Sequence, residues 1–190
     1  MNKAVFLDRD GTINVEKHYL HKVEEFEFLP GVIEGLKILQ DAGYLLVIVT
    51  NQSGIGRGYY TEEDFHHLNK WMIDTLKKQG VDITKVYYCP HLPNATVESY
   101  RKDCDCRKPK LGMYMQAAHE LDIDVDSSYT IGDKIRDCAI CESTGCKGFL
   151  IASNEKDEVI DCVKHGLVKG VLYSSDLLSS AKTIVNQQTI

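Results

Sequence analysis

Short apolar runs alternate with amphipathic stretches along the whole chain. Six runs have the length and apolar character of buried strands, at residues 4–7, 44–50, 86–88, 128–132, 147–151 and 170–173. Apolar residues recur at helical spacing in the stretches 31–43, 61–80, 112–121 and 134–144, and two weaker helices flank the last run. Thr61, which acidic residues follow, is a plausible N-cap. Strands that alternate with helices predict parallel β-α-β units, with helices on both faces of one sheet.

Length and composition favour a single folded domain over residues 1–190. The chain has 190 residues, of which 43% are hydrophobic and 26% charged, as in ordinary globular domains. The opening sequence MNKAVFLDRD has the features of neither a secretory signal nor a transit peptide, and no apolar stretch approaches the length of a membrane span. We therefore expect a cytoplasmic protein without a membrane partner, and a monomer by default.

The charge distribution argues against nucleic-acid binding. The formal net charge is −6, and no run of Lys and Arg is longer than two residues. A protein that follows a phosphate backbone needs a basic stripe, which this sequence lacks. A few local donors can still bind one phosphate group on an acidic protein. The expected partner is therefore a small phosphorylated molecule.

The strongest chemical signal is the sequence DRDGT directly after the first predicted strand. Asp8 and Asp10 can face one site if the chain turns there, and Gly11 permits such a turn. The alternative is an acidic turn with a helix cap. The pattern resembles the signature of the haloacid dehalogenase (HAD) superfamily, in which the first Asp attacks phosphorus and the second is general acid and then base. The resemblance implies those roles for Asp8 and Asp10.

A second polar segment, TNQSG, follows the second predicted strand. The hydroxyl groups and backbone N–H groups of Thr50, Asn51, Gln52 and Ser53 could hold phosphate oxygens. The resemblance gives Thr50 the contact to the phosphoryl group. In isolation the segment would be read as a polar loop, and its place after a buried strand favours a functional role.

A third segment, GDKIRD, presents acidic groups at another strand end. Hard oxygen ligands suit Mg²⁺, and a bound cation must offset the charge that repels a carboxylate nucleophile from phosphate. We predict a catalytic Mg²⁺ bound by the carboxylates of Asp8 and Asp133 and the backbone carbonyl of Asp10, with Lys134 beside it. Asp133 could also cap the following helix, and Asp137 could serve only to orient its neighbours.

The cysteines indicate a second metal. Cys89, His91, Cys104 and Cys106 form two tight pairs in the loop 89–111, which is otherwise predicted to lack regular structure. Three thiolates and one imidazole are a structural zinc set with no position left for water. The alternative is ordinary reduced thiols, which we expect for the four remaining cysteines because they fall in or beside helical stretches. The zinc-stabilised loop would place Lys108 to stabilise phosphate and Arg107 to bind the rest of the substrate, unless the two are exposed surface charges.

The motifs occur in one order over residues 6–137 as FLDRDGTIN, VTNQSGIGRG, YYCPHLP, CDCRKP and IGDKIRD. Together they resemble the zinc-containing HAD phosphatases, above all those that remove the 7-phosphate of D-glycero-D-manno-heptose 1,7-bisphosphate in nucleotide-activated heptose biosynthesis. Leu111 departs from the proline usual in that family. The resemblance implies a HAD-like Rossmannoid three-layer α/β/α fold with a mainly parallel sheet and a minimal cap. It implies substrate contacts at Glu16, Lys17, His18, Tyr19, Asn51, Gln52, Ser53, Arg107 and Lys134.

Three other functions remain open from the sequence. Histidinol-phosphate phosphatases carry similar motifs and are the nearest rival. Polynucleotide 3′-phosphatases use a similar aspartate pair, although the acidic charge balance counts against them. A non-catalytic sugar-phosphate binding protein would have no need of an acid such as Asp10 two residues from the nucleophile.

Overall fold

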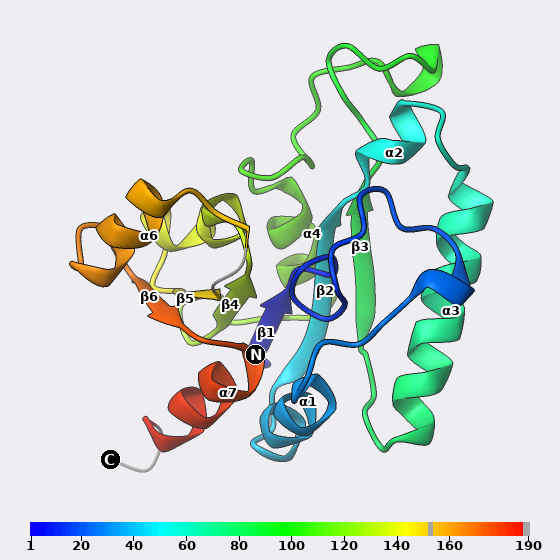
Figure 1. The fold of residues 1–190 in the computed structure, drawn as a ribbon. Helices are drawn as coiled ribbons and strands as arrows, with labels where there is room; N and C mark the ends of the chain where they lie inside the picture. The colour runs from blue at the N-terminus through cyan, green and yellow to red at the C-terminus, as the bar shows by residue number, and fades with distance from the viewer. Residues whose placement is uncertain (152–153, 188–190) are drawn as a thin grey trace.

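A single parallel sheet forms the centre of the molecule (Figure 1). The computed structural model describes residues 1–151 and 154–187. Within these residues six strands lie in the order β3-β2-β1-β4-β5-β6, and every ladder between them is parallel. The strands are β1 (Ala4–Leu7), β2 (Leu45–Asn51), β3 (Lys85–Cys89), β4 (Tyr129–Gly132), β5 (Lys147–Ile151) and β6 (Val171–Ser174).

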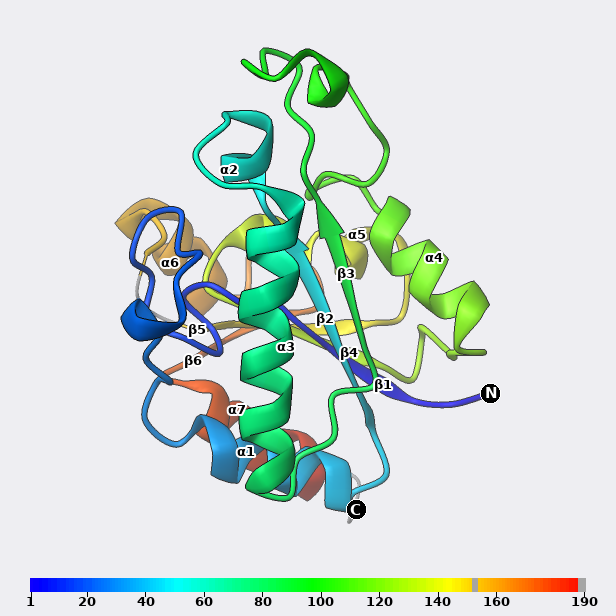
Figure 2. The same cartoon turned by 90° about the vertical axis from the view of Figure 1, so that its right-hand side faces the viewer.

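Helices cover both faces of this sheet (Figure 2). The α-helices are α1 (Val32–Asp41), α2 (Ser53–Gly56), α3 (Glu62–Lys78), α4 (Gly112–Glu120), α5 (Ile140–Ser143), α6 (Asp157–Lys164) and α7 (Leu177–Asn186). The part of the chain that the structure describes also contains three short 3₁₀ helices, η1 (Val23–Glu25), η2 (Glu98–Tyr100) and η3 (Ile135–Cys138). Buried side chains of α1, α3 and α7 share one core cluster, and those of α4, α5 and α6 share the other. The predicted three-layer α/β/α fold is confirmed.

The central strand β1 shows why the apolar runs are continuous. Val5 and Leu7 belong to the cluster on one face, and Ala4 and Phe6 belong to the cluster on the other. All four side chains are fully buried, because helices lie on both sides of a parallel sheet. A strand covered on both faces has no solvent side, so its sequence shows no alternation of apolar and polar residues.

One predicted helix, at 134–144, is wrong as a single element. The segment forms η3 and then the short α5. The carbonyl oxygen of Asp137 accepts hydrogen bonds from Tyr114 Oη at 2.7 Å and from Thr130 Oγ1 at 2.8 Å. These donors occupy both lone pairs of the oxygen, so it is not free to accept the bond that would continue a regular helix.

The strand order reverses beside β1, which pairs with β2 on one side and β4 on the other. In open parallel sheets ligands bind at the carboxyl ends of the strands at such a switch point. The three predicted motifs with acidic or hydroxyl groups lie at the carboxyl ends of β1, β2 and β4. No helix in the described ranges is both long enough and apolar enough to cross a membrane.

The predicted N-cap of α3 is confirmed as a capping box. Thr61 Oγ1 accepts from the Asp64 N–H at 3.1 Å, and Asp64 Oδ2 accepts from the Thr61 N–H at 2.8 Å. We expect Thr61→Ala to lower the free energy of unfolding by about 1 kcal/mol, because the Asp64 N–H loses its acceptor, Thr61 Oγ1. Urea unfolding measures this change. Thr96→Ala, at an exposed threonine, is the control, and equal stability of the two variants would contradict the capping role.

Candidate active site

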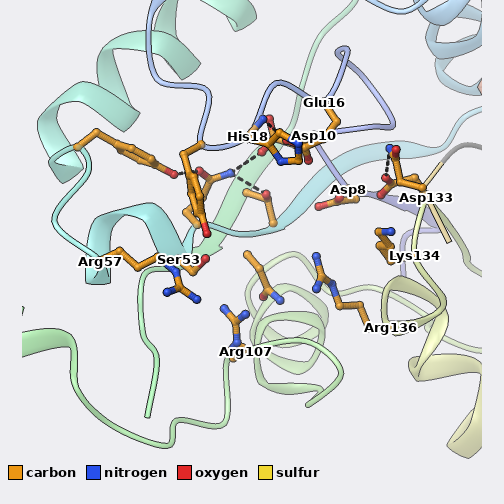
Figure 3. A pocket seen from close by; sticks show the side chains of 16 residues that line it. Asp8, Asp10, Glu16, His18, Ser53, Arg57, Arg107, Asp133, Lys134 and Arg136 are labelled. Atoms are coloured by element: carbon orange, nitrogen blue, oxygen red, sulfur yellow. Dashed lines mark hydrogen bonds between the residues drawn. The ribbon is translucent and has the colours of Figure 1, made fainter. Parts of the chain in front are cut away.

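Three predicted residues from separate strands line one cavity. Asp8 follows β1, Thr50 lies near the end of β2, and Asp133 follows β4. Their exposed fractions are 7%, 1% and 3%, so each is held almost completely inside the protein. The cavity beside them has a volume of about 500 Å³ and opens to solvent (Figure 3). The sheet topology therefore brings together groups separated by more than 100 residues in sequence.

A buried charge cluster lies beside this cavity and contributes Asp8 and Asp133 to its lining. Carboxylate oxygens of Asp8, Asp133 and Asp137 lie within 4.8 Å of one another. The Lys108 ammonium lies 2.9 Å from Asp8 Oδ1 and 2.7 Å from Asp137 Oδ1, and it donates to the Val49 carbonyl oxygen at 2.6 Å. Its side chain is 1% exposed. Two of the three carboxylates thus contact the buried ammonium, and Asp133 lies beside them.

Burial and the imbalance of charge together shift the pKa values of these groups. Burial raises the pKa of Asp8 to about 7; Lys108 opposes the rise, and the Asp137, Asp133 and Asp10 carboxylates add to it. Burial, with the Asp137 charge, raises the pKa of Asp133 to about 6. For Lys108 burial alone would lower the pKa, but Asp137 and Asp8 outweigh burial and raise it. The lysine therefore stays an ammonium while two carboxyl groups hold protons more tightly than usual.

This cluster fits a hard divalent cation. Its three side chains offer only oxygen ligands, and they carry more negative charge than Lys108 balances. Such a donor set suits Mg²⁺ or a similar ion, which would replace the missing positive charge. Asp137, whose role the sequence left undecided, belongs to the cluster.

Asp10 is held in place by its own partners. Arg9 is fully buried, and its Nη2 lies 3.1 Å from Oδ1 and 3.0 Å from Oδ2 of Asp10. Gln52 Nε2 donates to Asp10 Oδ2 at 2.9 Å, and Asn14 Nδ2 donates to Oδ1 at 3.0 Å. Both oxygens of Asp10 are therefore engaged, and its orientation is determined by three neighbours.

Gln52 connects Asp10 to the second strand. The same Nε2 also donates to Thr50 Oγ1 at 2.9 Å, and Gln52 Oε1 accepts from Tyr60 Oη at 2.5 Å. Gln52 is 2% exposed. A buried amide whose two polar atoms are both bonded within the protein fixes the relative positions of the groups that it joins.

The structure brings most of the predicted substrate contacts to the cavity wall. They are Glu16, His18, Tyr19, Asn51, Gln52, Ser53, Arg107 and Lys134. Lys17 does not line this cavity, because its Nζ donates to the Glu25 carbonyl oxygen at 2.8 Å and pairs with Glu27 at 3.3 Å. His18 and Tyr19 both have positive φ, at 45° and 63°, a strained backbone that brings their loop against the cavity.

Four lining residues had no predicted role, namely Arg57, Tyr60, Arg136 and Asn154. Both arginines stand inside quoted motifs, GIGRG and GDKIRD, so their charge was the signal that could have identified them. Asn154 donates to Asp133 Oδ2 at 2.9 Å. It lies beyond residue 150, outside the part of the chain that the quoted motifs cover.

Three arginines form a positive wall of the cavity. Figure 3 shows Arg57, Arg107 and Arg136 on one side, opposite Asp10 and Glu16. Burial lowers the pKa of Arg107, and the nearby charges of Arg136 and Arg57 lower it further, whereas the cluster cysteines oppose the change. Guanidinium groups that repel one another in this way form a site for an anion.

The four predicted zinc ligands also come together. The Sγ atoms of Cys89, Cys104 and Cys106 are separated by 3.1–3.4 Å, and His91 Nδ1 lies 3.3 Å from Cys106 Sγ and 3.7 Å from Cys89 Sγ. Tetrahedral zinc with bond lengths of about 2.0–2.3 Å requires ligand separations of roughly 3.4–3.8 Å. The cluster therefore fits a zinc ion after a small expansion.

Comparison with known proteins agrees with this geometry. The model of the polynucleotide kinase 3 phosphatase family matches residues 3–157. The D-glycero-beta-D-manno-heptose-1,7-bisphosphate 7-phosphatase of Haemophilus ducreyi is 47% identical over 178 residues, which are 90% of this chain and 97% of that protein. The chain belongs to the family of this Haemophilus ducreyi phosphatase. It is an enzyme of the HAD-like type, as the motifs predicted.

A solved structure extends the likeness to three dimensions. The D,D-heptose 1,7-bisphosphate phosphatase of B. bronchiseptica, complexed with magnesium and phosphate, superposes with a TM-score of 0.82 at 28% identity over 97% of this phosphatase and 99% of that chain. A Mesorhizobium loti protein described as a HAD-like phosphatase gives the same TM-score at 30% identity, over 98% of this chain and 87% of that one. The HAD-like fold predicted from the motifs is thus confirmed.

The charge cluster predicts an unusual pH dependence of stability without added Mg²⁺. The folded-state pKa of Asp8, about 7, lies above its usual 3.8, so the folded protein holds more protons than the unfolded one between these values. The free energy of unfolding therefore falls as pH rises from about 4 to about 7. We expect Asp8→Asn to raise it by about 1–3 kcal/mol at about pH 8 and to flatten this slope.

Urea unfolding at about pH 5 and about pH 8 measures both the slope and the effect of the substitution. The matched control is Asp82→Asn at an exposed site, for which we expect the wild-type slope. If Asp8→Asn lowered stability at the higher pH, the buried carboxylates would not be the destabilising charge.

Proposed function

We propose that this phosphatase removes the 7-phosphate from D-glycero-D-manno-heptose 1,7-bisphosphate. The observation that carries the proposal is a cavity with two separate places for phosphate. One lies at Asp8 and Thr50, where the buried Lys108 pairs with Asp8 from within the protein, and the other at the arginine wall. The name of the Haemophilus ducreyi relative, which is 47% identical to this chain, supports the β anomer of this sugar as the preferred substrate.

Asp8 is the proposed nucleophile. One of its carboxylate oxygens forms a bond to phosphorus while the bond from phosphorus to the sugar O7 breaks, which leaves a phospho-aspartate and a sugar alkoxide. Thr50 Oγ1 is proposed to donate to a non-bridging oxygen of the transferred group. Lys108 Nζ would do the same after releasing one of its three present acceptors, Asp8, Asp137 and the Val49 carbonyl. In a second step water attacks the same phosphorus, inorganic phosphate leaves, and the Asp8 carboxylate is regenerated.

Asp10 is the proposed proton carrier. It gives a proton to the leaving O7 in the first step and takes one from the attacking water in the second. The four hydrogen bonds to Arg9, Gln52 and Asn14 described above engage both of its oxygens. The acid step therefore requires Asp10 to release at least one of them once the substrate is bound.

We propose Mg²⁺ as the catalytic ion, because Asp8, Asp133 and Asp137 supply its preferred oxygen ligands. When bound, the ion offsets the negative charge that separates phosphate from carboxylate. The magnesium named in the B. bronchiseptica complex supports this choice. Lys134 lines the cavity beside the cluster and adds positive charge where the phosphoryl group would lie.

The arginine wall distinguishes the proposed substrate from its rivals. A heptose bisphosphate carries a second phosphate at C1, whereas histidinol phosphate carries none. Arg57, Arg107 and Arg136 can bind that second group with charge-assisted hydrogen bonds. The three guanidinium groups would otherwise face one another without an anion, so a bisphosphate fits this cavity better than a monophosphate.

A comparison of four substrates tests the proposal. With Mg²⁺ present, we expect kcat/KM for the β-heptose 1,7-bisphosphate to exceed that for the α anomer, histidinol phosphate and a 3′-phosphorylated oligonucleotide, with one phosphate released per sugar. Phosphate release measures each reaction. Faster turnover of histidinol phosphate would transfer the assignment to that activity.

Arg136→Gln separates the second phosphate from the first. We expect the variant to raise KM for the bisphosphate by about 10- to 100-fold, since charge-assisted hydrogen bonds of about 1.5–3 kcal/mol are lost. The control substrate is heptose 7-phosphate, for which the same variant should behave as wild type. An equal rise in KM for both substrates would contradict a separate site for the second phosphate.

We also propose that Cys89, His91, Cys104 and Cys106 bind a structural zinc ion. We expect about one zinc per chain by elemental analysis, and its loss in Cys106→Ser with a lower melting temperature. The control is Cys162→Ser, at an exposed cysteine outside the cluster. Because Arg107 and Lys108 follow Cys106 directly, turnover should fall with the zinc content. Zinc-free wild type that kept its stability and activity would contradict this role.

A further inference from the structure

The side chain of Asn51 is bonded to the backbone of Lys108 on both sides. Asn51 Nδ2 donates to the Lys108 carbonyl oxygen at 3.1 Å, and Asn51 Oδ1 accepts from the Lys108 N–H at 3.0 Å. We propose that Asn51 is a positioning residue, which fixes Lys108 in the active site, in place of the substrate contact expected from the motif. The inference rests on the proposed function of this site.

The two bonds join two differently built parts of the chain. Asn51 is the last residue of β2 and pairs in register with Cys89 of β3, so its backbone belongs to the sheet. Lys108 lies 57 residues later, in the loop that carries the cysteine cluster. A primary amide that bonds both backbone groups of one residue imitates a strand pairing. Asn51 thus ties Lys108 to the same strand that carries Thr50.

Lys108 depends on its backbone position more than most lysines do. Its ammonium must reach Asp8 and Asp137 inside the protein, with 1% of the side chain exposed. A side chain that is buried and held by three acceptors cannot readily compensate for a backbone that shifts. Displacement of a catalytic group by about 1 Å costs roughly 100-fold in rate. The proposed zinc cluster holds the loop at Cys106, and Asn51 holds it at Lys108 itself.

Asn51 also lines the cavity, so a substrate contact and a positioning role must be separated by experiment. If Asn51 acts through Lys108, Asn51→Ala lowers kcat by about 10- to 100-fold and leaves KM within about two-fold of wild type. In a Lys108→Ala background the same substitution changes kcat by less than about two-fold, because the group that it positions is gone.

A substrate contact predicts the opposite pattern. Asn51→Ala would then raise KM by about 10-fold or more, and it would do so equally in the Lys108→Ala background. Either result overturns the proposal. Wild-type turnover of the heptose bisphosphate is measured beside the variants, so failure of the proposed function is recognised separately as an inactive wild type.

A second measurement needs no substrate. Lys108 is buried in wild type, so its amine should react slowly with acetic anhydride, and mass spectrometry of the digested protein gives its labelling rate. We expect faster labelling of Lys108 in Asn51→Ala and an intermediate rate in the isosteric Asn51→Asp, which keeps only the acceptor. Asn51→Asp alone is used if the alanine variant does not fold.

The matched control is Asn94→Ala, an exposed asparagine in the same loop, for which labelling and kinetics should equal wild type. Thermal unfolding of each variant shows whether the loss is local. Wild-type labelling of Lys108 in both Asn51 variants would overturn the positioning role.

Discussion

The ion pairs of Lys108 with Asp8 and Asp137 are the interaction on which the site depends. A buried ammonium is costly unless it is paired, and here two carboxylates contact it while a third, Asp133, lies beside them. Burial raises the pKa of Asp8 and Asp133, and the neighbouring carboxylates add to the rise. The excess of negative charge also creates a place for a divalent cation. The charges that destabilise the fold are those proposed to serve catalysis.

The fold meets this cost by rigid placement of each partner. The switch in strand order brings Asp8, Thr50 and Asp133 to one edge of the sheet, whereas Lys108 comes from a loop with little regular structure. The cysteine cluster and the Asn51 amide compensate for the missing strand there, since each fixes the loop a few residues or less from the lysine. A loop stabilised in this way can carry a catalytic group with the precision of a strand.

The cavity has two regions of different chemistry, and this division underlies the proposed specificity. The inner region combines carboxylates with one ammonium and suits the phosphoryl group that reacts, together with its cation. The outer region presents three arginines, which suit a phosphate that is bound and not transferred. Remote binding energy of this kind can orient the reacting end of a small substrate without a large cap domain.

The sequence alone determined the strands, most helices, the aspartate pair, the cysteines and histidine of the cluster and the family, because each depends on local spacing or on a motif that the chain contains intact. The tertiary structure decided what depends on distant neighbours. Hydrogen bonds from Tyr114 and Thr130 interrupt the helix expected at 134–144. Arg57, Arg136 and Asn154 enter the site, and Lys17 leaves it. A motif specifies which residue types are present, but the direction of a side chain is set by the groups packed against it, and those come from other elements.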